Sequence, residues 1–226
     1  MSHTYNDKFM AYADESSRRS AARVTQQMAT VPHLASVLDV GCAKGTWLQA
    51  WRAAGIDDIQ GVDGDYVDRS QLVIPTERFL SSDLSRQVDL GRTFDLVQSL
   101  EVAEHIPATS ADTFVENLTR HSRGLILFSA APPGQGGEFH INEQPYDYWR
   151  QRFAAQVARR SRIWRAASCA ALPFRSLPVE AAVAEVLAIF CVSVAVTRTA
   201  SKRTPSSCAT TCATLVFRPW PISVPP

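Results

Sequence analysis

Short apolar runs and amphipathic stretches alternate along most of the chain. The runs with the Val, Ile, Leu and Phe content of buried strands are residues 36–42, 59–64, 78–84, 94–100 and 124–130. The stretches with helical spacing of apolar positions are residues 14–28, 46–55, 110–121 and 146–155. Strands separated by helix-length segments are typical of βαβ units with parallel strands. The pattern therefore predicts an α/β fold: a Rossmann-like, doubly wound, mostly parallel sheet with helices on both faces.

The turn after the first predicted strand combines small residues with the start of a helix. It reads DVGCAKG over residues 39–45, with small residues at Gly41, Ala43 and Gly45. Such a turn lets a ligand approach the backbone closely at a helix N-terminus, which indicates a nucleotide-type ligand. A dinucleotide fingerprint would place its third glycine at Thr46, so the spacing disfavours NAD. Asp63, at the end of the second strand, is expected to accept ribose hydroxyls; the alternative is a plain tight turn with Asp63 as a helix cap.

A second group of polar residues follows the fourth predicted strand. Glu101, Glu104 and His105 would share one face if the segment begins a helix. This face could ligate a divalent cation, or it could cap the helix and line a cleft. Without a metal, His105 or His140, which follows the fifth strand, could take a proton from an attacking hydroxyl, because imidazole titrates near neutral pH.

Charge and composition separate two unlike parts of the chain. The 226 residues carry 23 Lys and Arg against 22 Asp and Glu. Residues 1–156 hold 14 basic and 20 acidic side chains, whereas residues 157–226 hold 9 basic and 2 acidic ones. All Gly, His and Tyr residues precede residue 157, and no Asp, Asn or Gln follows it. We therefore treat residues 1–156 as one domain and residues 157–226 as an aberrant or accessory tail.

The tail has two interpretations. Losing the turn-forming residues together favours a reading-frame change near residues 155–158, which would leave the C-terminal edge of the sheet incomplete. The alternative is an accessory segment, with residues 179–196 as a helix or strand and residues 202–226 as a basic, Pro-rich arm. Translation of the other reading frames would distinguish the two.

The composition of the chain also bears on its location and its partners. The N-terminus lacks the apolar core of a signal peptide, and the longest uncharged apolar stretch, residues 186–197, is too short for a membrane span. The default location is the cytoplasm. Residues 1–156 have no basic face, so nucleic acid is not expected as a partner. The Cys spacing supports neither a zinc site nor a disulfide framework.

Five segments carry a resemblance to a known family. VLDVGCAKGTWL, GVDGD, SSDL, FDLVQSLEVAEHIP and SAAPPGQGGEFHINEQPYDYWRQRF resemble class I S-adenosylmethionine-dependent methyltransferases, particularly small bacterial methyltransferase-domain proteins related to the ubiquinone-pathway type. The resemblance covers residues 30–155. It implies that the Gly-rich turn lies under the methionine part of the donor, that Asp63 binds the ribose, and that Asp83 lies near the adenine amine. The positions expected to bind the donor are Asp39, Gly41, Cys42, Ala43, Gly45, Asp63, Gly64, Asp65, Asp83, Leu84 and Ser99.

The resemblance also bears on the second group of polar residues. The E-x-x-E-H element is similar to one in ubiquinone-pathway O-methyltransferases and in small-RNA 3′-terminal 2′-O-methyltransferases, where it forms a magnesium site completed by a later histidine. It implies a metal site of Glu101, Glu104, His105 and His140, for which Mg²⁺ is the expected ion, although two imidazoles would also admit manganese, iron or zinc. The expected catalytic residues are His105, His140 and Glu101. The loop at residues 134–142 is expected on the acceptor side, with His140, Asn142 and Tyr146 toward the substrate and Trp149 and Phe153 in the core.

The function expected from these features is transfer of the methyl group of S-adenosylmethionine to a hydroxyl of a small-molecule acceptor, in preference to nitrogen or carbon. The sulfonium donor is already activated, so the protein has to orient the reactants, exclude water and supply one base. Two alternatives stay open. One is a non-catalytic S-adenosylmethionine-binding or interaction protein with a damaged C-terminus, and the other is a nicotinamide oxidoreductase.

Overall fold

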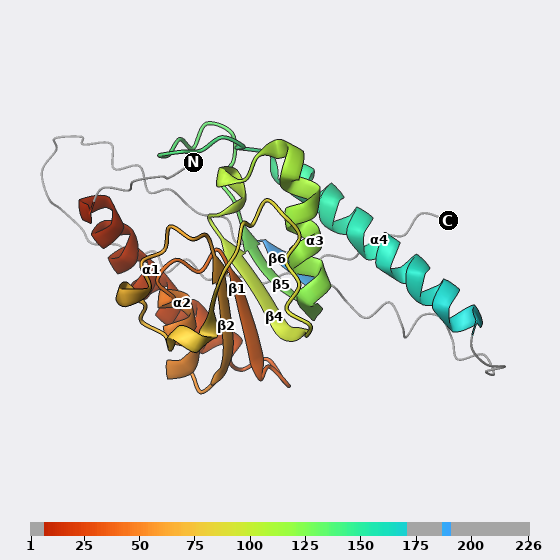
Figure 1. Cartoon of the computed structure of the whole chain (residues 1–226), viewed down its shortest axis with the longest axis horizontal. Coiled ribbons are helices and arrows are strands. Elements are labelled where there is room, and N and C mark those ends of the chain that lie inside the picture. The colour runs from red at the N-terminus through yellow and green to blue at the C-terminus, as the bar shows by residue number, and fades with distance from the viewer. Residues whose placement is uncertain (1–6, 171–186, 191–226) are drawn as a thin grey trace, which may run out of the picture. The chain divides into compact units, whose positions relative to one another are not determined.

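A parallel sheet forms the centre of the computed structural model, which describes residues 7–170 and 187–190, with side chains for residues 17–159 (Figure 1). Its strands are β1 (Ser36–Val40), β2 (Asp58–Asp63), β3 (Phe79–Ser81), β4 (Phe94–Leu100), β5 (Ser122–Ser129) and β6 (Leu187–Phe190). The strand order is β3-β2-β1-β4-β5-β6, and every described pair is parallel. The order reverses between β1 and β4, where α/β sheets bind their ligands.

Helices cover both faces of this sheet. They are α1 (Asp7–Met28), α2 (Thr46–Ala53), α3 (Ala111–His121) and α4 (Tyr146–Ala170). Helix α1 contacts α2, and α3 contacts α4 (Figure 1). Two apolar clusters correspond to these pairs: one contains Met28 and Trp51 from α1 and α2, and the other contains Phe114 and Trp149 from α3 and α4. The predicted α/β, doubly wound fold is confirmed.

Helix α2 shows how the local sequence sets an element. Gly45, with φ 87°, precedes the helix, and Gly55, with φ 94°, follows it. Left-handed backbone of this kind is accessible to glycine at little cost, so the two residues delimit the helix. Between them, Leu48 and Trp51 lie three residues apart and are completely buried. The helix therefore fixes the Gly-rich turn that leads into it.

Several boundaries differ from the sequence prediction. Strand β1 ends at Val40 rather than residue 42, because Gly41 turns the chain with φ 88°. Helix α1 begins at Asp7 rather than residue 14, and α4 continues to Ala170 rather than ending at residue 155. Trp149 and Phe153 of α4 are buried, which confirms their expected place in the core.

The C-terminal part of the chain is described only in part. Strand β6 pairs with β5 in parallel, with Leu187 opposite Leu125. No antiparallel strand pair occurs among the described residues. Residues 171–186 and 191–226, on which the reading-frame and basic-arm hypotheses depend, lie outside them. Within the described ranges, no helix combines the length and apolar character needed to cross a bilayer.

Candidate functional site

The segments that follow β1, β2, β4 and β5 meet at the carboxyl edge of the sheet. The turn after β1 contacts the segment after β4 directly, because a Cβ atom added to Gly41 would clash with the side chain of Val102. Only glycine fits this position without moving its neighbour. The Gly-rich turn and the Glu101–His105 segment therefore belong to one site.

Three positions in the turn after β1 have left-handed backbone. Gly41, Ala43 and Gly45 have φ values of 88°, 46° and 87°. Two are glycines, which adopt this conformation readily, whereas Ala43 adopts it at a cost of about 1–2 kcal/mol. A Cβ atom on Gly45 would lie 2.8 Å from Ile74 Cγ1, so this position is also closely packed. The turn thus presents backbone rather than side chains to a ligand.

The Asp63 carboxylate, at the end of β2, ties this turn to the next strand. It accepts hydrogen bonds from the backbone amides of Ala43 and Gly64, each at 2.7 Å, and from the hydroxyl of Tyr66. Burial raises the pKa of Asp63, while the hydrogen bond from Tyr66 and those from the two amides oppose the shift. A carboxylate has about four acceptor sites, so one remains for a ligand hydroxyl. Tyr66 is 53% exposed, so the side chain that donates this third hydrogen bond lies at the protein surface.

Asp39 lies beneath the turn in a buried position. Burial raises its pKa to about 7, the Gln98 side chain lowers it, and the nearby Asp63 carboxylate raises it further. The Trp51 indole donates a hydrogen bond to Gln98 Oε1 at 2.7 Å. Gln98 Oε1 is therefore occupied by Trp51, which leaves the amide nitrogen as the Gln98 group that lowers the pKa of Asp39, although no hydrogen bond of normal length and angle joins the two side chains.

The other residues expected to bind the donor fall into two groups. Cys42, Leu84 and Ser99 are buried, and the Ser99 hydroxyl donates to the carbonyl of Val40 at 2.7 Å. Asp65 and Asp83 are exposed, and Asp83 Oδ1 accepts from the amide and hydroxyl of Ser85. Cys42, Leu84 and Ser99 are thus part of the protein interior, whereas the carboxylates of Asp65 and Asp83 face solvent.

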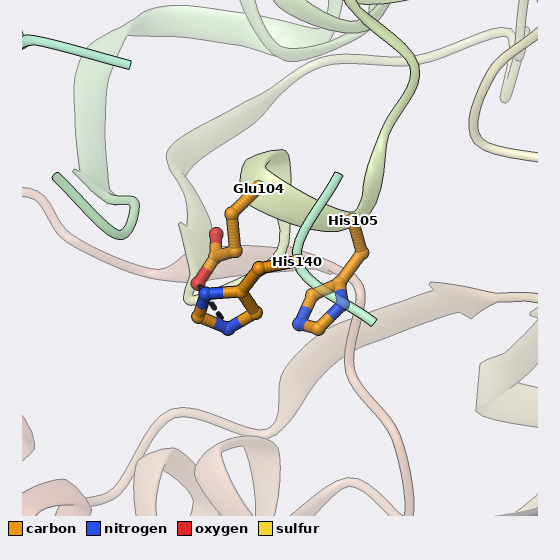
Figure 2. A group of neighbouring side chains, drawn as sticks. All are labelled: Glu104, His105 and His140. Atoms are coloured by element: carbon orange, nitrogen blue, oxygen red, sulfur yellow. Dashed lines mark ion pairs between the residues drawn. The ribbon is translucent and has the colours of Figure 1, made fainter. Parts of the chain in front are cut away.

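Three predicted side chains from the segments after β4 and β5 come together. Ligand atoms of Glu104, His105 and His140 all lie within 4.8 Å of one another (Figure 2). The His105 and His140 rings meet edge to face with centroids 4.9 Å apart, and His140 Nε2 lies 4.0 Å from Glu104 Oε1. We call these three residues the Glu-His-His cluster.

Glu104 is the most unusual member of this cluster. Its side chain is completely buried, and no group among the described residues donates a hydrogen bond of normal length and angle to either carboxyl oxygen. Burial raises its pKa to about 8; the backbone amides of Glu104 and Ala131 oppose the shift, and the carboxylates of Glu101 and Glu143 add to it. A buried carboxyl without a donor is costly, which is typical of a site that meets its partner in a bound ligand.

Glu101 does not join the cluster. The spacing argument placed Glu101, Glu104 and His105 on one face of a helix, but the helical turn here is a short 3₁₀ segment, Ala103–His105. Glu101 precedes it with φ 57°, and its carboxylate accepts from the Gln135 side chain at 3.3 Å. The assumption of a regular helix was therefore wrong, and Glu101 contacts the loop after β5 instead.

That loop, residues 130–145, brings His140 to the cluster. The backbone amides of Ile141 and Asn142 both donate to the carbonyl of Glu104 at 2.9 Å. His105 Nδ1 lies 3.2 Å from the carbonyl of Phe139. Asn142, which was expected to face the substrate, is buried, and its amide contacts the carbonyl of Ala103 at 3.5 Å. Asn142 therefore anchors the loop, and His140 is the residue that it presents.

The residues of the cluster do not suit magnesium. Two imidazoles and one carboxylate provide two nitrogen donors and a single side chain with oxygen donors, whereas Mg²⁺ prefers near-complete oxygen coordination. Glu101, the second expected carboxylate, lies outside the group. The arrangement of these side chains thus does not support the expected Mg²⁺ site.

Three residues of the site were not predicted. Tyr66 and Gln98 act on Asp63 and Asp39, and Glu143 accepts a hydrogen bond from His140 Nδ1 at 2.8 Å. The hydrogen bond from His140, the largest contribution, lowers the pKa of Glu143. Only Glu143 had a signal in the sequence, namely a carboxylate three residues after a histidine within a Gly-rich loop.

Comparisons with known proteins agree with this architecture. A family model described as a methyltransferase domain matches residues 11–168. A search of curated proteins found no match. Among solved structures, an S-adenosylmethionine-dependent methyltransferase from Archaeoglobus fulgidus is similar, with 15% identity, a TM-score of 0.52, and coverage of 66% of this chain and 74% of the other.

Two further structures are similar at lower TM-scores. The amino pentose methyltransferase CalS10 from Micromonospora echinaspora has 24% identity, a TM-score of 0.44 and coverage of 55% of each chain. The sugar N-methyltransferase KedS8 from Streptoalloteichus sp. has 22% identity, a TM-score of 0.44 and coverage of 63% of each chain. The chain thus matches less than two thirds of the length of these two proteins.

Proposed function

Because this chain belongs to the family of methyltransferase domains, with S-adenosylmethionine as the methyl donor, we propose that it methylates a hydroxyl oxygen of a small-molecule acceptor. The family and the donor were predicted from the sequence and are confirmed by the family match. The observation that carries the proposal is the contact of the Gly-rich turn with the segment bearing Glu104 and His105, through Gly41 and Val102. It sets a donor site and a proton-accepting site side by side.

The residues around the turn fit the donor. The turn at residues 41–45 leads directly into the N-terminus of α2, where backbone amides attract polar groups of a ligand. Asp63 supplies a buried carboxylate at the end of β2, with an acceptor site remaining for a ribose hydroxyl. When bound, the donor supplies an activated methyl group on sulfur. The chain has to hold this group in line with the acceptor oxygen and keep water out.

The Glu-His-His cluster fits an attacking hydroxyl. Three ligand atoms within 4.8 Å of one another leave a point at which one oxygen atom lies in hydrogen-bond reach of all three, about 2.6–3.2 Å. In the proposed step a bond forms between this oxygen and the methyl carbon, the carbon–sulfur bond breaks, and the hydroxyl proton passes to His140 Nε2. His105 and the Glu104 carboxyl group would orient the hydroxyl, and the protonated His140 would lie beside the Glu143 carboxylate.

The charge around the cluster limits the acceptor. Residues 93–119 and 124–149, which supply the segments after β4 and β5, contain no Lys or Arg. The same segments bring Glu101, Glu104, Glu138 and Glu143. Carboxylate and phosphate groups of an acceptor would find no cation there, so we propose a neutral or cationic acceptor and not a nucleic acid.

A labelling experiment tests the proposal. The purified chain is incubated with S-adenosylmethionine carrying an isotopically labelled methyl group and a panel of neutral polyols, phenols and amino alcohols, and the products are identified by mass spectrometry and NMR. We expect an O-methylated product that His140→Asn abolishes. His33→Asn is the matched control, because His33 is an exposed histidine of the loop before β1, at the opposite edge of the sheet. Products labelled only on nitrogen, or saturable donor binding without any product, would contradict the proposal.

A further inference from the structure

We infer that Glu143 is a positioning residue that holds His140 with its hydrogen on Nδ1, so that Nε2 is the nitrogen available to the acceptor hydroxyl. The catalytic role of this contact rests on the proposed function, whereas the geometry of the contact does not depend on that function. One carboxylate takes three hydrogen bonds within a single loop: from the amide of Gly134, the amide of Gly136 and the ring of His140, each at 2.8 Å.

These contacts settle which ring nitrogen donates. Backbone amides can only donate, and they occupy Oε2 and Oε1 of Glu143, so both oxygens act as acceptors. His140 Nδ1 meets Oε1, and it therefore donates its hydrogen there. In a neutral imidazole the lone pair then lies on Nε2. That atom faces Glu104 across 4.0 Å, inside the Glu-His-His cluster (Figure 2).

The backbone of residues 134–137 also favours the contact between Glu143 and His140. Gly134 and Gly136 have φ values of 85° and 67°, which turn both amides toward one carboxylate. Gly137 lies directly against the ring of His140, and a Cβ atom at this position would clash with it. The hydrogen bond to Glu143 and the contact with the His105 ring define this ring orientation, and the absence of a side chain at Gly137 leaves space for it.

The tautomer is measurable without an acceptor. In a ¹⁵N-histidine-labelled sample at neutral pH, long-range ¹H–¹⁵N spectra distinguish protonated from unprotonated ring nitrogens, and His140→Asn assigns the signals. We expect a protonated Nδ1 and an unprotonated Nε2 in the wild-type chain. In Glu143→Gln we expect the signals to move toward the Nε2–H form. Glu138→Gln changes an exposed glutamate of the same loop and should leave the spectrum unchanged.

A kinetic readout separates positioning from simple support of the fold. With an acceptor from the labelling experiment, Glu143→Gln should lower kcat about 100-fold or more and leave the affinity for S-adenosylmethionine unchanged. Wild-type His140 protonated on Nε2, or an unchanged tautomer in folded Glu143→Gln, would overturn the inference. Because the wild-type spectrum alone decides the first point, a variant that fails to fold does not prevent the test. A correct tautomer without any methyl transfer would instead count against the proposed function.

Discussion

The carboxylate of Asp63 accepts a hydrogen bond from the backbone amide of Ala43 at 2.7 Å, joining the end of β2 to the turn after β1. The bond fixes the one residue in the turn whose side chain disfavours its backbone conformation, because Ala43 has φ 46°. The residue proposed to bind the donor ribose is therefore connected directly to the strained position in the turn.

Replacing Ala43 with glycine should relieve this strain. We expect Ala43→Gly to raise the free energy of unfolding by up to about 1 kcal/mol, since left-handed backbone costs an alanine more than the added freedom costs the unfolded glycine chain. Urea denaturation measures the difference. In Ala50→Gly, where the alanine lies inside α2, the same substitution should lower stability by about 1 kcal/mol. Equal losses in both variants would show that the turn is unstrained.

The sequence was sufficient for the fold because the apolar runs of β1, β2, β4 and β5 are long and well separated. It was less sufficient at element ends, where single residues decide. Gly41 ends β1 two residues early through its backbone angle. The first residues of α1, from Asp7, are largely polar, and their apolar periodicity is too weak to predict a helix. Such ends depend on tertiary contacts and backbone conformation, which hydrophobic periodicity does not encode.

The buried carboxyl of Glu104 should make stability depend on pH. Burial raises its pKa from 4.5 to about 8, so the folded chain keeps a proton that the unfolded chain releases near pH 4.5. Raising the pH through this window favours unfolding. As the pH rises from about 4.5 to 8, the free energy of unfolding of Glu104→Gln should therefore increase relative to that of the wild type by on the order of 4 kcal/mol.

Urea denaturation of both chains across this pH range tests the effect. Glu77→Gln is the control, because Glu77 is exposed and its replacement should add no pH-dependent difference. If the difference in the free energy of unfolding between the wild type and Glu104→Gln stays constant with pH, Glu104 titrates in the folded chain as it does in water. The account of an unpartnered buried carboxyl would then be wrong.

Magnesium should have no specific effect on the cluster. Two imidazoles and one carboxylate are poor ligands for Mg²⁺, so excess Mg²⁺ should leave the Tm of the wild-type chain unchanged. Treatment of the chain with a chelator should also leave its Tm unchanged. Thermal melts of the wild type and His140→Asn measure this. A rise in Tm with Mg²⁺ that disappears in His140→Asn would contradict the expectation.

The site was predictable in its parts but not in its arrangement. The residue types and the carboxyl ends of the strands correctly brought Glu104, His105 and His140 together. Glu101 was misplaced because the spacing argument assumed a regular helix, whereas its φ of 57° turns the chain before the 3₁₀ segment. Glu143 was missed because its role depends on how a glycine-rich loop folds back on itself.

The most direct test of the central claim is a calorimetric titration of the wild-type chain and Asp63→Asn with S-adenosylmethionine. The substitution keeps the size of the side chain but removes the charge that accepts a hydrogen bond from the Ala43 amide and that we propose binds the ribose hydroxyls. Loss of a charged hydrogen bond should weaken binding about 10-fold to 100-fold. Asp57→Asn, which changes an exposed carboxylate next to the opposite end of β2, should bind like the wild type. Saturable wild-type binding that weakens only in Asp63→Asn is the expected result, whereas a folded wild-type chain that does not bind the donor would contradict the account.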